Sequence, residues 1–452
     1  MTDTSNLTDK LKLVLKNIPS DWLNLTTHRL DIYHEELAKT EFLGHFEKLV
    51  STEFSAQDLA ELPTAYDYIR LGHPLSSVFE WYLALQNGVD ASCVISFQSR
   101  TMPILAILRK NLFANAKTRV VYKGGLPECL NLESLQTVYG YNLETVRLAS
   151  ESQLSAFEGT TIFLSENNGK WEIDNSVEAD FYLLTDLVLG SVVVAKSEKS
   201  QKYVSEIQHV RRRESIAITP ANCLVALNAI AGNSTQNKSL NKNQIEENRR
   251  TVINAIRNIT ATEKEAVIGS SGLSVQYAIM MGLVDYAQKN HTGKAIKFMV
   301  PPNCYGGTND QARRVAACLE NVEVVDLPVD REHDMVNSVE QVLTQVAEQD
   351  AVPYIIAEIP TNPRVEVPDL VQLKAVLAKP RTTSSGAEAV SPVFILDQTF
   401  CPNVPFLGEN GFLSGVKTIS YVSGSKFPSG GKCTAGYCVA NQPAESLLEP
   451  IN

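Results

Sequence analysis

The chain has 452 residues, of which 40 are basic and 51 acidic, and its formal net charge at pH 7 is −11. This length exceeds what one hydrophobic core usually holds, so two or more domains are expected. The acidic balance argues against nucleic acid or an anionic membrane as the main partner and favours a small metabolite or a protein.

The first residues, "MTDTSNLTDKLKLVLKNIPS", have neither the apolar core nor the cleavage site of a signal peptide. No apolar run reaches the roughly 18 residues that a membrane-spanning helix needs. The eight cysteines are scattered without CxxC or Cys/His metal spacing, so we expect reduced thiols and no metal site. These features favour a cytoplasmic protein.

Short apolar runs rich in β-branched residues alternate with segments of helical period along most of the chain. This pattern is typical of a parallel sheet covered by helices, so the predicted fold class is α/β. In the second half we expect strands at 295–300, 322–327, 354–359 and 393–399. An amphipathic helix is expected between two of them from the helical spacing of Val336, Val339, Leu343 and Val346. Polar composition predicts a linker at 232–244 and an exposed loop at 380–392.

Polar residues follow several of these elements, at the sheet edge where open α/β sheets place their ligands. In "GSSGLS" (269–274), Ser270, Ser271 and Gly272 precede an apolar helical segment, and backbone amides there suit a phosphate group. The same residues also suit a plain helix start. This motif alone therefore leaves both interpretations open.

Three further polar side chains lie beyond apolar strands. Tyr305 in "CYGGTND" offers a ring for stacking on a flat ligand, or is an ordinary loop tyrosine. Asn362 in "AEIPTNP" and Asp397 in "LDQTF" lie at the ends of the apolar runs expected as strands 354–359 and 393–399. A carboxylate in such a place is also a common cap or turn residue.

The stretch "YVSGSKFPSGGKCTAG" (421–436) places Lys426 directly after Ser423 and Ser425. Lys432 follows shortly afterwards, but its neighbours are Gly431 and a cysteine. An exposed surface position is the ordinary fate of a lysine and remains the alternative for Lys426.

Taken in order, these segments resemble the Cys/Met-metabolism family of pyridoxal-phosphate enzymes, which includes the cystathionine synthases and lyases. The resemblance covers 266–445 strongly, and "SGSK" matches the serine-x-serine-lysine tetrad of that family. It implies that Lys426 attaches pyridoxal 5'-phosphate and that the other matched residues bind it. The phosphate would be held by Ser423, Ser425, Ser271, Gly272 and Leu273. Tyr305 would stack on the ring and Asn362 would lie beside the phenolate. Asp397 would keep the ring nitrogen protonated.

The same family uses a Tyr-x-Arg followed by Gly-Asn-Pro to grip the phosphate of a neighbouring subunit, and the second half has no such motif. The first half contains "YIRLGHP", in which Tyr68, Arg70, Gly72 and Pro74 are in place and His73 replaces the asparagine. A bidentate arginine contact suits a phosphate dianion. The alternative is that Tyr68 and Arg70 only pack a domain interface.

From Tyr68 onward the first half (60–230) weakly repeats the family order. "VISFQSRTMPIL" places Arg100 where the cradle glycine belongs, and "VVYKGGLPE" and "IFLSENNGKWEID" echo the tyrosine and asparagine segments. At the lysine position stand Thr185 and Asp186, so no amine is available. The first half would thus be a degenerate copy that keeps the trans-acting motif, fused to a copy that keeps the lysine.

This interpretation gives four parts: an N-terminal helical extension at 1–59, a degenerate domain at 60–231, a linker and helix at 232–265, and a pyridoxal-phosphate-binding domain at 266–452. Only "YCVANQPAESLLEPIN" follows the lysine loop, whereas the family continues into a C-terminal domain with a carboxylate-binding arginine. We expect either a fragment or another carboxylate ligand.

The resemblance implies an enzyme that performs elimination at Cβ or Cγ, or replacement at Cγ, of a sulfur-containing or O-acylated amino acid. It is most like a cystathionine γ-synthase or γ-lyase, with Lys426 as the base at Cα and Tyr305 as a stacker and proton relay. Its partners would be a small amino-acid substrate and further copies of the pseudo-dimeric chain. The rival hypothesis is a pseudoenzyme that retains the fold as a structural or regulatory subunit.

Overall fold

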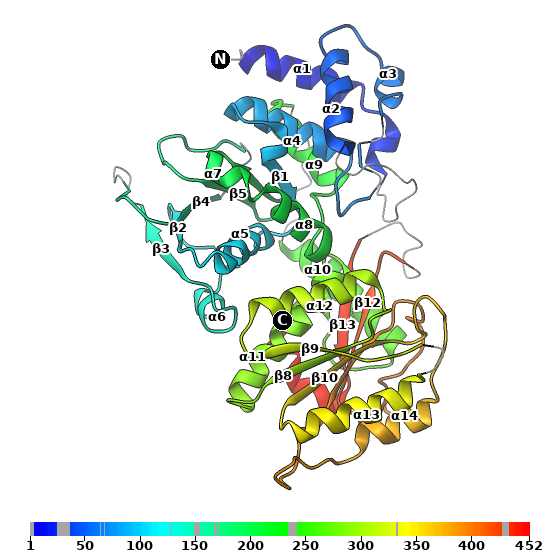
Figure 1. Cartoon of the computed structure of the whole chain (residues 1–452). Coiled ribbons are helices and arrows are strands. Elements are labelled where there is room, and N and C mark those ends of the chain that lie inside the picture. Colours follow the sequence, from blue (N-terminus) through cyan, green and yellow to red (C-terminus); the bar gives the residue numbers. More distant parts are fainter. Residues whose placement is uncertain are drawn as a thin grey trace. The chain divides into compact units, whose positions relative to one another are not determined.

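The computed structural model describes residues 4–24, 37–63, 65–66, 68–127, 129–148, 154–166, 169, 171–233, 242–330, 333–426 and 434–452. The chain divides into two compact units, Met1–Lys238 and Ser239–Asn452, each of which is described by itself (Figure 1). Residues 234–241 of the predicted linker and Lys432 lie outside the described residues.

The first unit contains a mixed sheet and helices on both sides of it. Its strands are β1 (Val94–Phe97), β2 (Thr118–Tyr122), β3 (Leu143–Arg147), β4 (Thr160–Glu166), β5 (Phe181–Asp186) and β6 (Gly190–Ala195). Its α-helices are α1 (Thr4–Lys16), α2 (Ala38–Leu49), α3 (Ala56–Ala60), α4 (Pro74–Asn87), α5 (Met102–Phe113), α6 (Leu132–Thr137), α7 (Glu198–Gln201), α8 (Val204–Glu214) and α9 (Pro220–Ile230).

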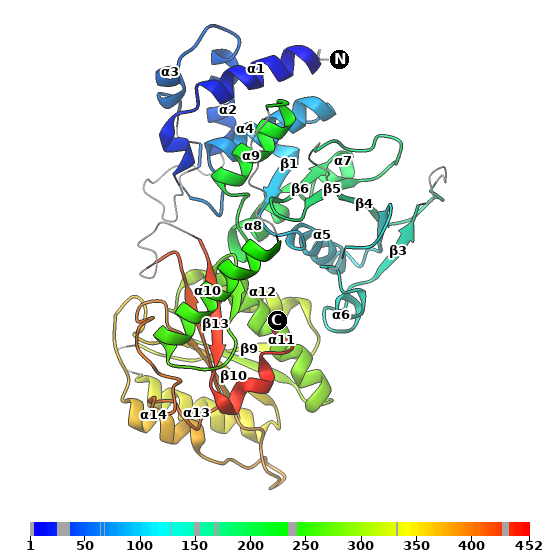
Figure 2. The same cartoon turned by 180° about the vertical axis from the view of Figure 1, so that it is seen from behind.

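The helices that precede the first sheet belong to its hydrophobic core. Leu11 of α1 and Phe46 of α2 are fully buried in the same cluster as Phe79 of α4 and Phe163 of β4. Helix α1 packs on α4 and α9, and α2 packs on α4 (Figure 2). The segment predicted as an N-terminal helical extension therefore contributes apolar side chains to the core of the unit.

In its described residues, the second unit has a seven-stranded sheet and five α-helices. Its strands are β7 (Val267–Gly269), β8 (Ile296–Val300), β9 (Val322–Asp326), β10 (Val352–Glu358), β11 (Val393–Asp397), β12 (Thr418–Ser423) and β13 (Gly436–Ala440). Its helices are α10 (Lys242–Thr260), α11 (Gly272–Asn290), α12 (Gly306–Cys318), α13 (Met335–Glu348) and α14 (Leu370–Ala378). The four predicted strands are confirmed as β8, β9, β10 and β11.

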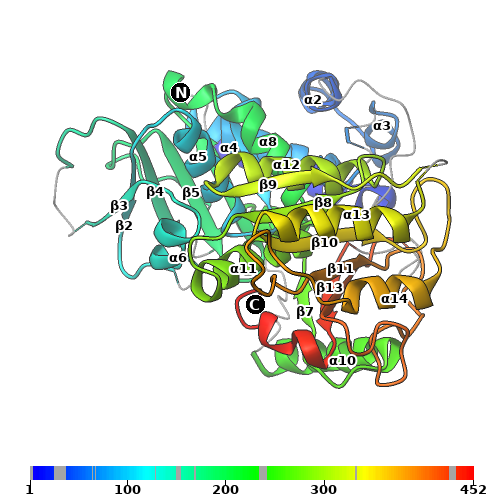
Figure 3. The same cartoon turned by 60° about the horizontal axis from the view of Figure 1, so that its bottom comes forward.

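The predicted amphipathic helix is α13, and all four of its apolar positions are buried. Asp334 caps it, because its side chain accepts a hydrogen bond from the backbone N–H of Asn337. Helices α13 and α14 lie side by side over β10 and cover one face of the sheet (Figure 3). Helices α11 and α12 lie on the other face (Figure 1). The fold class is therefore α/β with parallel-rich sheets flanked by helices, as predicted.

The two sheets have closely related topologies. The first has the order β1-β6-β5-β4-β2-β3 and the second β7-β13-β12-β11-β10-β8-β9. In each, the second strand in the order is antiparallel to both its neighbours and the remaining pairs are parallel. If β11 is left out of the second sheet, its remaining six strands correspond one to one, in position and in the direction of pairing, to the six strands of the first sheet. Among the described residues, the first sheet thus has no counterpart of β11, the strand that ends at Asp397.

The described residues that link β3, β4 and β5 in the first unit contain no helix, whereas the second unit has α13 and α14 at these connections. Trp171 and Ile173, from the connection between β4 and β5, are buried in the first core instead.

Within the described ranges, none of the helices combines the length and apolar composition that a membrane crossing requires.

Candidate functional site

Three neighbouring strands of the second sheet end at the same edge with polar side chains. Glu358 at the end of β10 is in register with Asp397 at the end of β11. Ser423 at the end of β12 is in register with Gly436 of β13, which in turn pairs with Gly269 at the end of β7. The register therefore brings segments far apart in the sequence to one edge of the sheet.

Helix α11 begins at this edge and lies against the end of β12. A Cβ added to Gly272 would lie 2.7 Å from the Cβ of Ser423, so a side chain at residue 272 would collide with the strand. Ser271 caps the helix, because its Oγ accepts from the Ser274 N–H at 3.1 Å while Ser274 Oγ accepts from the Ser271 N–H at 2.9 Å. The first-turn amides of a helix lack intrahelical partners, which makes them available to an anion.

Ser423, Ser425 and Lys426 lie in and just after β12, next to that helix start. The hydroxyls of Ser423 and Ser425 are 2.9 Å apart, and the Ser423 N–H donates to Thr399 Oγ1 at 3.0 Å. All three residues are half-buried. Two hydroxyls and a helix N-terminus thus meet at one place, which is a donor set suited to a phosphate.

Glu358 joins the two loops that carry Tyr305 and Asn362. Its Oε1 accepts from the Tyr305 N–H at 2.8 Å, and its Oε2 accepts from the Asn362 N–H at 3.1 Å. Only 6% of Glu358 is exposed. Burial and the neighbouring Asp397 charge raise the pKa of Glu358 to about 7, against the two amide hydrogen bonds, which lower it.

Asp397 is held by the turn that follows β11. Its Oδ1 accepts from the Thr399 N–H at 3.0 Å. Burial raises the pKa of Asp397, and its hydrogen bonds with Thr399 offset this only in part. In the described part of the chain, no ion pair joins Asp397 or Glu358 to a cationic side chain. Two adjacent carboxylates, one buried and one half-buried, favour a positively charged ligand group.

Buried glutamines connect the elements behind the site. Gln276 of α11 accepts from the Tyr421 hydroxyl at 3.0 Å and donates to the Thr308 carbonyl at 3.3 Å. Gln311 of α12 donates to the Leu273 carbonyl at 2.9 Å. These bonds fix α11 and α12 against β12, so that the helix start keeps its place relative to the sheet edge.

The structure therefore brings together nine predicted residues at one edge of the second sheet: Ser271, Gly272, Leu273, Tyr305, Asn362, Asp397, Ser423, Ser425 and Lys426. Tyr68 and Arg70 belong to the other unit. Glu358 and Thr399 were missed as site residues, although both stand within the segments "AEIPTNP" and "LDQTF". The available signal for Glu358 was a carboxylate at the end of the strand next to that of Asp397.

In the first unit, the Tyr-x-Arg segment forms a tight turn. The Leu71 and Gly72 N–H groups both donate to the Tyr68 carbonyl, and the Arg70 guanidinium lies 4.7 Å from the centroid of the Tyr68 ring. Gly72 has φ +140°, and a Cβ there would lie 2.6 Å from the Tyr66 ring. Only glycine fits this position without strain.

His73 takes over a structural task that an asparagine can also perform. Its Nδ1 accepts from the Ser76 N–H at 3.2 Å and so caps α4, which assigns the proton to Nε2, 2.6 Å from the Ile218 carbonyl. Burial lowers the pKa of His73 to about 4, so the ring is neutral at pH 7. The departure from the family motif thus keeps the cap.

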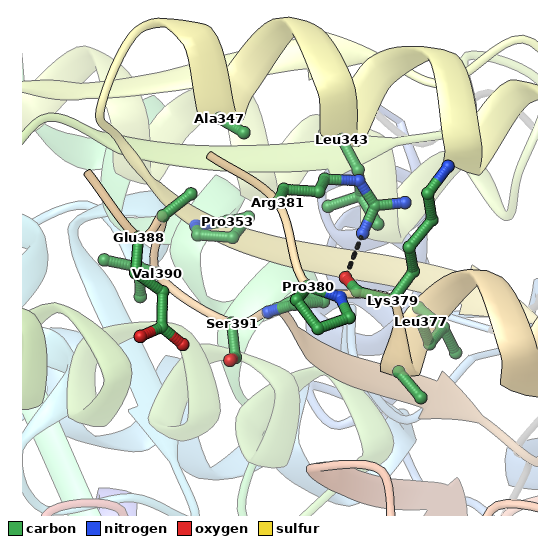
Figure 4. Close-up of a pocket in the computed structure, with 13 residues that line it drawn as sticks. Leu343, Ala347, Pro353, Leu377, Lys379, Pro380, Arg381, Glu388, Val390 and Ser391 are labelled. Atoms are coloured by element: carbon green, nitrogen blue, oxygen red, sulfur yellow. Dashed lines mark hydrogen bonds between the residues drawn. The ribbon is translucent and has the colours of Figure 1, made fainter. Parts of the chain in front are cut away.

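A separate small pocket lies at the opposite edge of the second sheet. Pro353 at the start of β10 and Pro392 just before β11 line it, together with Arg381. Arg381 donates to the Lys379 carbonyl at 3.1 Å (Figure 4). Residues of the loop predicted at 380–392 form part of the lining of this pocket. The carboxylates of the candidate site do not line it.

The residues at the carboxyl edge fit pyridoxal phosphate. The helix start and the two serines suit the phosphate, Asp397 suits a protonated ring nitrogen, and Lys426 suits attachment of the aldehyde. Among the described residues, no cationic side chain forms an ion pair with Asp397 or Glu358, which agrees with this donor set.

No family model matches this chain. Comparison with curated proteins also finds no match. Among solved structures, the chain is similar to a cystathionine γ-lyase from Micromonospora echinospora, with 18% identity and a TM-score of 0.32, over 45% of this chain and 44% of that one. For the cystathionine γ-lyase from yeast the identity is 20%, the TM-score 0.34 and the coverage 45% and 44%. For metB from Corynebacterium glutamicum the values are 16%, 0.31, 44% and 44%.

The chain thus spans less than half of the length of each of these solved structures. The assignment of an activity therefore depends on the residues of this chain.

Proposed function

We propose that the chain is a pyridoxal-phosphate-dependent enzyme of sulfur amino-acid metabolism. It would carry out elimination at Cβ or Cγ, or replacement at Cγ, on a sulfur-containing or O-acylated amino acid, as a cystathionine γ-synthase or γ-lyase does. The observation that carries the proposal is the convergence of Asp397, the Tyr305 and Asn362 loops, the α11 start and the Ser423–Lys426 turn at one sheet edge.

Each side chain has a physical task in this proposal. The Asp397 carboxylate would hold a proton on the ring nitrogen, and Tyr305 would stack on the ring. The amine of Lys426 would attach the cofactor and then, once substrate has displaced it, move a proton at the substrate Cα. When bound, the cofactor supplies the electron sink that makes this Cα proton acidic.

We also propose that the first unit is a degenerate copy of the second. The matching strand orders support this proposal, and the missing counterpart of β11 adds the ring-nitrogen carboxylate to the features that the first unit lacks. Tyr68 and Arg70 would then complete the phosphate site of the second unit in trans. On this proposal each chain holds one cofactor, and chains of this kind would assemble as homo-oligomers.

A second candidate is a pseudoenzyme that binds the cofactor without turnover. The first sheet, which has no counterpart of β11 in its described residues, favours it, because a degenerate first unit would already be without the means of catalysis. Such a pseudoenzyme would convert no amino-acid substrate.

The two candidates differ in a simple experiment. Apoprotein is titrated with pyridoxal phosphate, and visible absorption reports binding to Lys426. Sulfur-containing and O-acylated amino acids are then added, and release of a keto acid and exchange of the Cα proton with deuterated water are measured. Turnover supports the enzyme, binding without exchange supports the pseudoenzyme, and failure to bind pyridoxal phosphate refutes both.

A further inference from the structure

Glu358 occupies a place that no task in the proposed reaction requires. It lies beside Asp397 on the neighbouring strand, yet its two oxygens are taken by backbone amides of two different loops. One loop follows β8 and carries Tyr305, and the other follows β10 and carries Asn362. One buried side chain therefore bonds to both loops.

We propose that Glu358 is a positioning residue that holds the Tyr305 and Asn362 loops at the cofactor site through both oxygens of its carboxylate. The inference rests on the proposed function for the identity of the ligand, but the clamp itself is a property of the free protein. A carboxylate can accept at both oxygens, whereas an amide of the same shape accepts at one and donates at the other. Glutamine at residue 358 therefore leaves one of the two N–H groups facing another donor.

The clamp requires ionised Glu358, and its surroundings make that ionisation sensitive to pH near neutrality. The groups that face it are Asp397 from β11, Tyr421 from β12 and Cys304 ahead of α12. Burial raises the pKa of Cys304 to about 12 and that of Tyr421 well above its ordinary value, so both stay neutral below pH 8. Because Glu358 itself has a pKa of about 7, a proton on its carboxyl group should loosen the clamp as the pH falls.

Hydrogen exchange of the free protein tests the clamp without any cofactor. At pH 8, Glu358→Gln should speed exchange of the Tyr305 or Asn362 amide by about tenfold, because a buried hydrogen bond to a charged acceptor is lost. In wild type, protection of the same amides relative to intrinsic rates should fall between pH 8 and pH 6. Glu323→Gln is the matched control, since this glutamate of β9 pairs with Lys297 and should leave both amides unchanged.

Pyridoxal phosphate provides the second measurement. The ratio of dissociation constants of Glu358→Gln and wild type should be about ten at pH 8 and approach one at pH 6, because protonated wild type then resembles the variant. Equal exchange in variant and wild type, or a ratio that does not change with pH, would overturn the clamp. If wild type binds no pyridoxal phosphate but the exchange difference is present, the proposed function fails and the clamp stands.

Discussion

A buried ion-pair network in the first unit gives a stability prediction whose size follows from the structure. The Nζ of Lys39 donates to Glu80 Oε2 at 2.6 Å and to the carbonyls of Ala91 and Val94 at 2.5 and 3.0 Å. Glu80 Oε1 accepts from Arg211 at 2.8 Å. Lys39 is 4% exposed and Glu80 1%, so water cannot replace these bonds.

Lys39→Met should therefore strongly destabilise the first unit. The substitution removes the ammonium donor from Glu80 Oε2 and from the carbonyls of Ala91 and Val94. Removing one partner of a buried ion pair costs about 3–5 kcal/mol. Burial by itself raises the pKa of Glu80, but the charges of Lys39 and Arg211 outweigh it and hold the pKa below its ordinary value. The loss of Lys39 removes the larger of these two charge effects.

Urea unfolding followed by tryptophan fluorescence measures this change in the first unit alone. All three tryptophans of the chain, Trp22, Trp81 and Trp171, lie there and are buried. Lys12→Met is the control, because the Lys12–Asp9 pair of α1 is 49% and 72% exposed and should be worth less than about 1 kcal/mol. A loss for Lys39→Met no larger than that of the control would refute the reasoning.

Three further predictions concern the proposed site. Lys426→Ala should abolish the pyridoxyl label that borohydride leaves on the protein, whereas Lys432→Ala should retain it; peptide mapping decides between them. Asp397→Asn should retain the cofactor but slow exchange of the substrate Cα proton by several orders of magnitude, because the ring nitrogen loses its charged partner. Proton NMR in deuterated water measures this exchange. An unchanged exchange rate would mean that Asp397 is only a turn residue. Arg70→Ala should raise the dissociation constant of pyridoxal phosphate roughly tenfold to a hundredfold, because a lost charge-assisted hydrogen bond costs about 1.5–3 kcal/mol. Arg100→Ala is the control and should leave the dissociation constant unchanged. Equal affinities of Arg70→Ala and wild type would contradict the proposal that Arg70 completes the phosphate site in trans.

The strands and the amphipathic helix of the second unit could be predicted because their signals are local. Apolar runs such as 295–300 and 393–399 fix strand positions, and the period of residues 336–346 fixes the buried face of α13. Polar residues after such runs then mark the sheet edge, since parallel strands end on the same side. Asp397 and Asn362 were found in this way.

Glu358 could not be assigned its contacts in the same way, because they depend on strand register and on the path of a distant loop. The sequence separates Glu358 from Tyr305 by 53 positions and gives no sign that a side chain of one bonds to the backbone of the other. The difference between the two sheets could not be predicted for a similar reason. That the described first sheet has no strand between β4 and β5 equivalent to β11 becomes visible only when both strand orders are known.

The Tyr68 turn has more buried support than an exposed turn of this length requires. Arg211 donates to the Leu71 carbonyl and also to Glu80, so the Lys39 network ends at the turn. On its other side the Ala217 N–H donates to the Ile69 carbonyl at 3.2 Å. In its described residues the first unit thus combines a sheet that has no counterpart of β11 with a turn that is fixed by buried charges. The proposed role of Arg70 requires such a fixed turn. An arginine that binds a phosphate in trans must be held in place even if its own unit carries out no chemistry.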